Sequence, residues 1–224
     1  MNNKIKRFER KWIFNSNNHI ALINTIIRSD LFFREQYAAR DVNSIYFDTK
    51  NYLSIRQNLD GISEKKKIRI RWYGDNNIIC NPSVEIKSKK GFETKKETIL
   101  INEIDGCKIY DYRNLESISK KLNLLLKSKK TIYPILTTNY TREYFISLNG
   151  KIRATIDYNL KSKFLKNLSQ IEIVKNFKNI CILELKYPTS LDRYVRKNIQ
   201  NISLRLTKNS KFINSAIEKP KFVC

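Results

Sequence analysis

The chain has 224 residues and a formal net charge of +23, from 44 Lys and Arg against 21 Asp and Glu. Apolar residues make up 41%, enough for a folded core, and no apolar run approaches the roughly 20 residues of a membrane-spanning helix. The cysteines are dispersed (Cys80, Cys107, Cys181, Cys224) and form neither a zinc motif nor a disulfide pattern. A single histidine, His19, excludes a His-rich metal site. With no signal-peptide pattern, these features predict a reduced, cytoplasmic compartment.

The excess of positive charge implies an anionic partner. Nucleic acid, a membrane surface and a polyanionic small molecule all fit a charge of +23. Part of the excess is unspecific, because the chain is rich in Lys, Asn and Ile together, as AT-rich coding sequences produce. The positions of the charges must therefore separate these partners.

The hydrophobic pattern is mostly of period two, which is typical of strands. In chain order it predicts a strand at 7–13, a helix at 16–31 with Ser16 as N-cap, a strand at 42–47, a helix at 52–58, strands at 65–73, 84–88 and 92–99, a helix at 115–126, strands at 137–147, 151–158 and 181–187, and helices at 189–204 and 209–217. No internal repeat or long linker interrupts this order. We expect one α+β domain over residues 1–224, with a sheet large enough to close or nearly close.

Charged residues gather on one face of several predicted strands. In residues 67–72 three cations, Lys67, Arg69 and Arg71, alternate with apolar residues and so share a face. A Glu-x-Lys pair, also on one face of an extended chain, occurs three times: Glu9/Lys11, Glu85/Lys87 and Glu184/Lys186.

Two architectures fit this pattern. One is a half-buried antiparallel sheet whose charged face is in water. The other is a barrel whose charged face lines a tunnel, while amphipathic helices cover its apolar outer face. Alternate arginines suit bidentate contacts to phosphate, and carboxylates among the cations are the oxygen ligands that a divalent metal requires. These two details favour the tunnel.

At these residues the sequence resembles the VTC-type polyphosphate polymerase domain, a branch of the triphosphate tunnel metalloenzyme (CYTH-like) superfamily. The segments that carry the resemblance occur in the family's order and span nearly the whole chain. They are residues 7–12, 42–49, 59–61, 67–74, 84–87, 140–145, 153–157 and 183–188. One departure is Arg7, which stands where the wider superfamily has an acid.

The resemblance implies an antiparallel β-barrel with a basic tunnel and a polymerase that uses ATP and Mn²⁺ or Mg²⁺ to extend inorganic polyphosphate. The cations carried over as catalytic are Arg69, Arg71, Lys87, Arg142 and Arg153. Those carried over as phosphate- or ATP-binding residues are Lys11, Lys186, Lys95 from the basic run 89–96, and Ser210 and Lys211 from the segment 208–212. Glu184 matches the metal-binding glutamate, with Glu9, Glu85 and Asp157 as further candidates that could instead be ion-pair partners.

Other functions remain open at this point. The same tunnel could hydrolyse inorganic or nucleoside triphosphate, or could hold polyphosphate without turnover, and a nucleic-acid-binding β protein is a fourth alternative. No Walker A loop is present among the five glycines. We expect ATP and inorganic polyphosphate as partners, no specific nucleic acid and no membrane span in this chain. A protein partner stays open.

Overall fold

The computed structural model of the chain describes residues 7–15, 19–91, 93–109, 111–127, 130–167, 170–177, 179–200, 206–207 and 209–217. The strands are β1 (Arg7–Asn15), β2 (Arg34–Asp48), β3 (Lys65–Tyr73), β4 (Ser83–Lys90), β5 (Glu93–Leu100), β6 (Tyr133–Ile146), β7 (Arg153–Asn167), β8 (Gln170–Asn176) and β9 (Ile180–Pro188). The helices are α1 (His19–Ile27), α2 (Leu53–Leu59), α3 (Tyr112–Leu126), α4 (Asp192–Asn198) and α5 (Lys211–Ala216), with 3-10 turns at Asn102–Ile104 and Thr189–Leu191.

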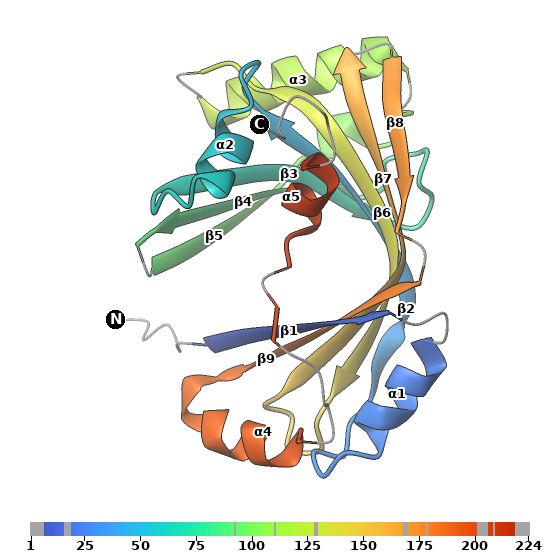
Figure 1. The fold of residues 1–224 in the computed structure, drawn as a ribbon. Coiled ribbons are helices and arrows are strands. Elements are labelled where there is room, and N and C mark those ends of the chain that lie inside the picture. The colour runs from blue at the N-terminus through green and yellow to red at the C-terminus, as the bar shows by residue number, and fades with distance from the viewer. Residues whose placement is uncertain are drawn as a thin grey trace. The chain divides into compact units, whose positions relative to one another are not determined.

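The strands form an antiparallel sheet in the order β1-β9-β7-β6-β2-β3-β4-β5, and β8 pairs with β7 (Figure 1). The predicted α+β class with an antiparallel sheet is therefore confirmed. The chain divides into two compact units. Unit 1 comprises Met1–Arg40, Tyr140–Leu160 and Phe177–Asn209, and unit 2 comprises Asp41–Asn139, Lys161–Asn176 and Ser210–Cys224.

The core of unit 1 lies on one face of β1, β9 and β7. Strand alternation directs Trp12, Ile156 and Leu183 to this face, where they pack with Leu22 of α1 and Val195 of α4. All five side chains are buried. Burying an aliphatic or aromatic side chain of this size contributes roughly 1.5–3 kcal/mol, so this shared face stabilises both helices on the sheet.

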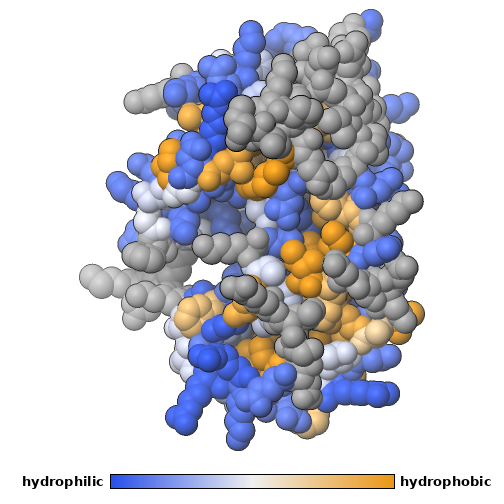
Figure 2. Space-filling view, in the orientation of Figure 1, coloured by the Kyte–Doolittle hydropathy of each residue, from blue (hydrophilic) through white to orange (hydrophobic). Residues whose placement is uncertain are grey.

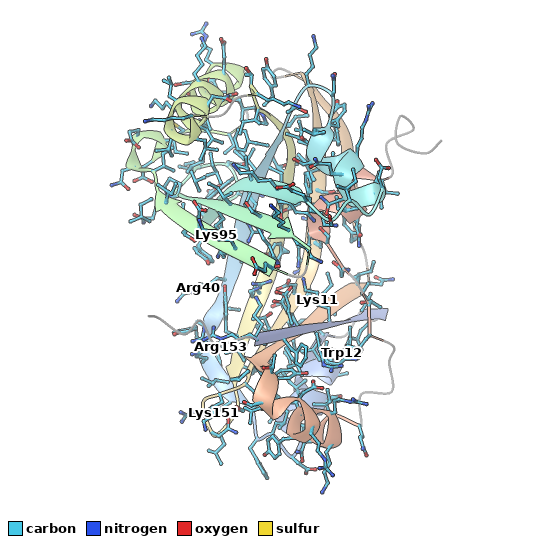
Figure 3. All side chains as sticks on the ribbon, turned by 90° about the vertical axis from the view of Figure 1, so that its left-hand side faces the viewer. Lys11, Trp12, Arg40, Lys95, Lys151 and Arg153 are labelled. Atoms are coloured by element: carbon cyan, nitrogen blue, oxygen red, sulfur yellow. The ribbon has the colours of Figure 1, made fainter. Side chains whose placement is uncertain are left out.

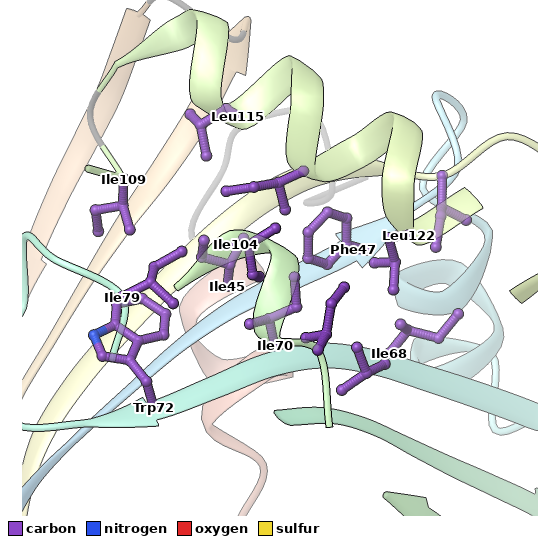
Figure 4. Packing of buried hydrophobic residues seen from close by; sticks show 14 of the residues in the cluster. Ile45, Phe47, Ile68, Ile70, Trp72, Ile79, Ile104, Ile109, Leu115 and Leu122 are labelled. Atoms are coloured by element: carbon purple, nitrogen blue, oxygen red, sulfur yellow. The ribbon is translucent and has the colours of Figure 1, made fainter. Parts of the chain in front are cut away.

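The larger core of unit 2 lies between β3 and α3. Ile68, Ile70 and Trp72 alternate along β3 and meet the stripe of α3 that contains Leu115 and Leu122 (Figure 4). The stripe has helical spacing, as the sequence predicts for residues 115–126. Trp72 also donates its indole N–H to the carbonyl of Asp75 at 2.8 Å, which satisfies the polar group of an otherwise buried side chain.

Helix α5 occupies a place that differs from the prediction. The sequence predicts that the amphipathic helices cover the apolar outer face of the sheet. Phe212 of α5 instead stacks on Tyr46 of β2, with ring centroids 4.8 Å apart. The β2–β3 register places Tyr46 opposite Arg69, so α5 packs on the face that carries the cations.

The bounds of several elements differ from the prediction. The strands β2 and β7 are longer than predicted, and the helix α1 is shorter. Residues 34–41 of β2 are exposed on both faces apart from Gln36, so they lack the alternation that marks a strand. Strand β7 continues far beyond 158, and β8 is missed. Helix α4 covers Asp192–Asn198 of the helix predicted at 189–204. The end of that prediction, from 201 on, and Ser16 lie outside the described residues.

Hydrophilic side chains cover much of the molecular face in Figure 2, with hydrophobic residues in smaller groups between them. None of the helices in the described part of the chain is both long and apolar enough to cross a membrane.

Asp48 fixes the connection from β2 to α2. Its carboxylate accepts backbone N–H bonds from Thr49 at 2.7 Å, Ser54 at 2.9 Å and Ile55 at 3.0 Å. Tyr52, just before the helix, has a left-handed backbone with φ 55°. The buried carboxylate therefore supplies the acceptors that the first turn of α2 lacks.

We predict that Asp48→Ala lowers the free energy of unfolding by about 2 kcal/mol or more, because three N–H groups lose their acceptor. Urea denaturation followed by circular dichroism measures this. The control is Asp30→Ala, since Asp30 is exposed and should change stability by less than about 0.5 kcal/mol. Equal stability of the two variants would contradict the role of Asp48.

Candidate functional site

Unit 2 presents a charged face that the strand registers assemble. Arg69 of β3 is opposite Glu85 of β4, and Lys67 is opposite Lys87. Lys87 is in turn opposite Lys96 of β5. Directly opposed residues of antiparallel strands lie on the same face, so these side chains share one surface with Arg71. We call this set the unit 2 charged face: Lys67, Arg69, Arg71, Glu85, Lys87 and Lys96.

Glu85 is the centre of this face. Its Oε2 accepts from Arg69 Nε at 2.8 Å, and its Oε1 lies 2.9 Å from Lys96 Nζ and 3.4 Å from Arg71 Nη1. The Glu85 side chain is only 9% exposed. Burial alone would raise the pKa of Glu85, but the charges of Arg69 and Arg71 and the bond from Lys96 outweigh it and lower the pKa to about 2. One ionised carboxylate thus holds three cations in place.

The remaining contacts fix two cations more firmly. Arg69 Nη1 donates to the hydroxyl of Tyr46 at 3.1 Å. Lys67 Nζ donates to Ser210 Oγ at 3.0 Å and lies 5.7 Å from the centroid of the Phe212 ring. The face carries five cations and one carboxylate, so its surplus charge is positive and favours an anionic ligand.

Lys95 is a prediction that the structure corrects. Successive side chains of β5 alternate between faces, and Lys96 is the one that reaches Glu85. Lys95 is 70% exposed on the opposite face and pairs with Glu97 at 2.8 Å. Lys96 is therefore a basic residue of 89–96 that lies on this face, in place of Lys95.

Ser210 and Lys211 lie at the start of α5. Ser210 Oγ accepts from Lys67 and caps the helix by accepting from the N–H of Ile213 at 3.4 Å. Ser210 thus contacts a cation of the unit 2 charged face, while Lys211 is the first residue of the helix. Their contact with phosphate stays a prediction.

Unit 1 has a second charged face, on β1, β9 and β7. Lys11 is opposite Glu184, and Glu184 is opposite Thr155 on the next strand. Lys186 is flanked in the same way by Glu9 and Arg153. Lys11 projects from β1 and Arg153 from the start of β7 (Figure 3). We call this set the unit 1 charged face: Glu9, Lys11, Arg142, Arg153, Thr155, Asp157, Glu184 and Lys186.

Glu184 is the centre of this face. Lys186 forms an ion pair with its Oε1, and Lys11 Nζ lies 3.4 Å from its Oε2 and 2.8 Å from Oε1 of Glu9. The Glu184 side chain is 7% exposed. Burial alone would raise the pKa of Glu184, but Lys186, Lys11 and Arg142 lower it to about 2. Burial alone would lower the pKa of Lys11, but the charges of Glu184 and Glu9 outweigh this effect and raise the pKa of Lys11. The carboxylate is ionised at neutral pH.

Arg142 and Asp157 form a buried bidentate pair. Arg142 Nε donates to Asp157 Oδ1 at 2.5 Å and Nη2 donates to Oδ2 at 2.7 Å, and the Asp157 side chain is 1% exposed. Burial disfavours the charge of Arg142, yet Asp157 raises the pKa of Arg142 well above its usual value. Both oxygens of Asp157 are used by Arg142, so its geometry is that of an ion-pair partner. Arg153, in contrast, is exposed and has no ion pair with any residue that the structure describes.

The carboxylates of the unit 1 charged face suit a divalent metal whose remaining ligands are phosphate oxygens of the substrate. Among the described residues no group of three or more His, Cys, Asp or Glu could hold a metal alone. Mg²⁺ is commonly held by one or two carboxylates together with substrate phosphates. Glu184 and Glu9, which share Lys11, provide that donor set. Glu85 does not, because it is the one carboxylate of the unit 2 charged face and its neighbours on that face are cations.

His19 lies away from the unit 1 charged face. Its ring stacks on Tyr158 with centroids 4.0 Å apart, and its Nε2 is 3.8 Å from Oε1 of Glu143. Tyr158 packs against the apolar core of unit 1. The chain's one imidazole therefore does not reach Glu184 on the other face of the strands. Cys80, Cys107 and Cys181 are free thiols, and Cys224 lies outside the described residues.

The site predicted from the sequence omits three members of the charged faces and one residue that contacts them. They are Lys67, Lys96, Tyr46 and Thr155. The alternation of residues 67–71 already places Lys67 beside Arg69, so that signal was present in the sequence. Lys96 and Tyr46 depend on the pairing of strands far apart in the chain, which no local pattern fixes.

Comparisons with solved structures define the class of fold. The chain is similar to a candidate adenylate cyclase from Vibrio parahaemolyticus, with 15% identity and a TM-score of 0.52 over 93% of this chain and 98% of that chain. It is also similar to a candidate adenylyl cyclase from Hippeastrum with a dominant triphosphatase activity, with 13% identity and a TM-score of 0.57 over 96% and 98% of the two chains. These likenesses show the triphosphate tunnel fold of CYTH-like proteins.

The sequence itself gives the family. It matches the model of the VTC domain over residues 6–217, so the chain belongs to the VTC domain family. The resemblance stated from the motifs is thereby confirmed. No curated protein matches the chain.

We predict that stability falls as the pH is lowered from about 4.5 towards 2. Glu85 has a folded-state pKa of about 2, below the roughly 4.3 of an unfolded chain, so the unfolded state binds more protons in this window. Its stabilising contribution is present above the unfolded pKa and is lost as the pH approaches the folded one.

Urea denaturation at pH 5 and pH 3 tests this prediction. Glu85→Gln cannot titrate, so the loss of stability between the two pH values should be smaller than in the wild type. The matched control is Glu93→Gln, because Glu93 is an exposed carboxylate on the neighbouring strand β5, and no ion pair joins it to the residues that the structure describes. A pH dependence unchanged by Glu85→Gln would contradict the assigned ion pairs.

Proposed function

We propose that this protein is an ATP-dependent polyphosphate polymerase, which transfers the γ-phosphoryl group of ATP to the end of an inorganic polyphosphate chain. Membership of the VTC domain family and the triphosphate tunnel fold support a phosphoryl-transfer enzyme. The two charged faces support a substrate with many negative charges. An enzyme of this kind works by positioning and by neutralising charge, with little covalent chemistry of its own.

The choice of a polyphosphate chain end over water as the phosphoryl acceptor rests on the ionised state of the buried glutamates. The pKa of Glu85 and that of Glu184 are each about 2, and each carboxylate contacts at least two cations. A carboxylate this acidic is a poor general base for activating water. The terminal phosphate of a polyphosphate chain is already anionic at neutral pH and needs no such base. The charged faces therefore suit a phosphate acceptor better than water.

In the proposed reaction an oxygen of the terminal phosphate attacks the γ-phosphorus. A new P–O bond forms, the bond from the γ-phosphorus to the β–γ bridging oxygen breaks, and ADP leaves with that electron pair. Lys11, Lys186 and Arg153 bind phosphate oxygens on the unit 1 charged face, where Glu184 holds the two lysines in place. A divalent metal held by Glu184 and Glu9 would neutralise charge on the phosphates.

The unit 2 charged face binds phosphates in the same manner. Arg69 and Arg71 are fixed by Glu85, so little side-chain entropy is lost when they meet a phosphate. Lys67, Lys87 and Lys96 add positive charge on the same surface. In a site of low dielectric each of these charges acts more strongly than it would in water.

A triphosphatase is the second candidate function. It is favoured by the dominant triphosphatase activity in the description of the Hippeastrum protein, which shares the fold. Water would then take the place of the polyphosphate chain end as acceptor. A domain that binds polyphosphate without turnover is the third candidate.

The product of the reaction separates these candidates. We predict that purified protein with ATP and Mn²⁺ forms phosphate chains that gel electrophoresis resolves as a ladder, with ADP released in equal amount to the phosphate incorporated. Orthophosphate as the sole product would establish the triphosphatase, and the absence of both products would establish a binding domain.

We predict that Lys96→Ala lowers turnover at least threefold, because it removes a cation of the unit 2 charged face. Lys95→Ala is its matched control, since it removes the same charge from the neighbouring residue on the opposite face and should leave turnover unchanged. Initial rates at saturating ATP measure both. Equal losses in the two variants would indicate a general effect of net charge and contradict the assigned face.

Glu184→Gln tests the other face. Since the charge of a carboxylate holds a hard cation, we predict that the variant loses at least tenfold in turnover, about 1.4 kcal/mol, and requires a higher metal concentration. Circular dichroism controls for folding. Full activity at ordinary metal concentration would remove Glu184 from the site.

A further inference from the structure

Unit 1 contains a cluster of two tyrosines and an arginine that the proposed reaction does not use. The rings of Tyr37 and Tyr144 meet edge to face with centroids 5.9 Å apart. The guanidinium of Arg40 lies 5.5 Å from the centroid of Tyr37 and 6.0 Å from that of Tyr144. Arg40 is therefore within cation–π range of both rings. We call these three residues the tyrosine–arginine cluster.

Tyr144 brings the cluster to the unit 1 charged face. Tyr144 is two residues after Arg142 on β6, so the two side chains share a face. The hairpin from β6 to β7 is closed by a bond from the N–H of Ser147 to the carbonyl of Ile152, and Arg142 pairs with Asp157 in the same register. This register places Tyr144 level with Thr155.

Thr155 connects the cluster to the centre of the face. It is directly opposite Glu184 on the neighbouring strand. Strands lie about 4.8 Å apart, so Tyr144 is two strands, or about 10 Å, from Glu184 along one row. The hydroxyl of Thr155, between them, is buried and has no hydrogen-bond partner among the described residues. Such a separation is one that the sugar and phosphates of a nucleotide can span.

The cluster is accessible, which distinguishes it from the structural tyrosines of this unit. The Tyr37 side chain is 51% exposed, whereas Tyr187 is buried in the core of unit 1. Arg40 is also exposed and is visible on β2 in Figure 3. An exposed aromatic ring with a guanidinium above it is a surface on which a planar, electron-rich group can stack from solvent.

We propose that the tyrosine–arginine cluster binds the base of the nucleotide substrate, and so makes the enzyme favour a nucleoside triphosphate over inorganic triphosphate. This proposal rests on the proposed function, because it takes the phosphates to lie beside Glu184. The base stacks on the exposed ring of Tyr37, and Arg40, which already contacts both tyrosine rings, holds that ring in place. Thr155 donates a hydrogen bond from its hydroxyl to an oxygen of the nucleotide between the base and the phosphates.

This arrangement predicts that the protein prefers a nucleoside triphosphate to inorganic triphosphate, but does not distinguish one base from another. Every base has a π face, and stacking does not depend on its hydrogen-bonding edge. The two tyrosines and Arg40 already touch in the protein, so little additional order is required when the base binds. Inorganic triphosphate has no base and gains nothing from the cluster.

Competition binding with two ligands tests the proposal. The ligands are a non-hydrolysable ATP analogue and inorganic tripolyphosphate, each measured with the full chain as wild type, Tyr37→Ala, Tyr37→Phe and Tyr194→Ala. We expect Tyr37→Ala to weaken binding of the ATP analogue about tenfold and to leave tripolyphosphate unchanged. Tyr37→Phe keeps the ring and should bind both ligands as the wild type does.

Tyr194→Ala is the matched control. Tyr194 is an exposed tyrosine on α4 of the same unit, and no ring contact joins it to the described residues. Its loss should change neither affinity. Equal weakening of both ligands by Tyr37→Ala, no weakening of either, or no binding of the ATP analogue by the wild type would each overturn the proposal.

The binding measurement tests the base-binding cluster and the product assay tests the polymerase, so either proposal can be wrong while the other holds. If the protein releases only orthophosphate but Tyr37→Ala still weakens the ATP analogue selectively, the polymerase is wrong and the base-binding cluster stands. If phosphate chains form but Tyr37→Ala affects both ligands alike, the polymerase stands and the cluster is structural.

Discussion

A buried glutamate surrounded by cations organises the charged face of each unit. Glu85 and Glu184 sit at the centre of their charged faces and are almost inaccessible, yet both are ionised because positive side chains enclose them. Removing such a carboxylate would leave several cations close together without a counter-charge. The arrangement therefore keeps the cations in fixed positions while each face retains a surplus of positive charge for a ligand.

This design fits a substrate whose charge stays high throughout the reaction. Phosphoryl groups remain anionic from ground state to transition state, so fixed cations are useful at every step. The ion pairs hold Arg69 and Lys11 before a ligand arrives, which lowers the entropy lost on binding. The same carboxylates stay ionised at neutral pH, because the cations around them lower the pKa of each.

Each charged face has aromatic rings beside it. In unit 2, Tyr46 supports Arg69 and stacks on Phe212 of α5. In unit 1, the tyrosine–arginine cluster continues the row that runs from Glu184 through Thr155. Aromatic rings beside cations add contacts that inorganic phosphate cannot use, so they are the places where a nucleotide can be recognised by its organic part.

The residues that share a strand face can be predicted from the sequence alone, because side chains alternate with period two whatever the partner strand is. That rule sufficed for Lys67, Arg69 and Arg71, for the Glu-x-Lys pairs, and for the apolar faces of Trp12 and Trp72. It could not choose between Lys95 and Lys96, since both alternation phases of residues 93–98 are polar. Only the tertiary structure decided that Lys96 meets Glu85, that Asp157 is occupied by Arg142, and that α5 packs beside Tyr46. These contacts depend on strand order and register between distant segments, and the free energy that selects them comes from burial of whole faces and not from any local pattern.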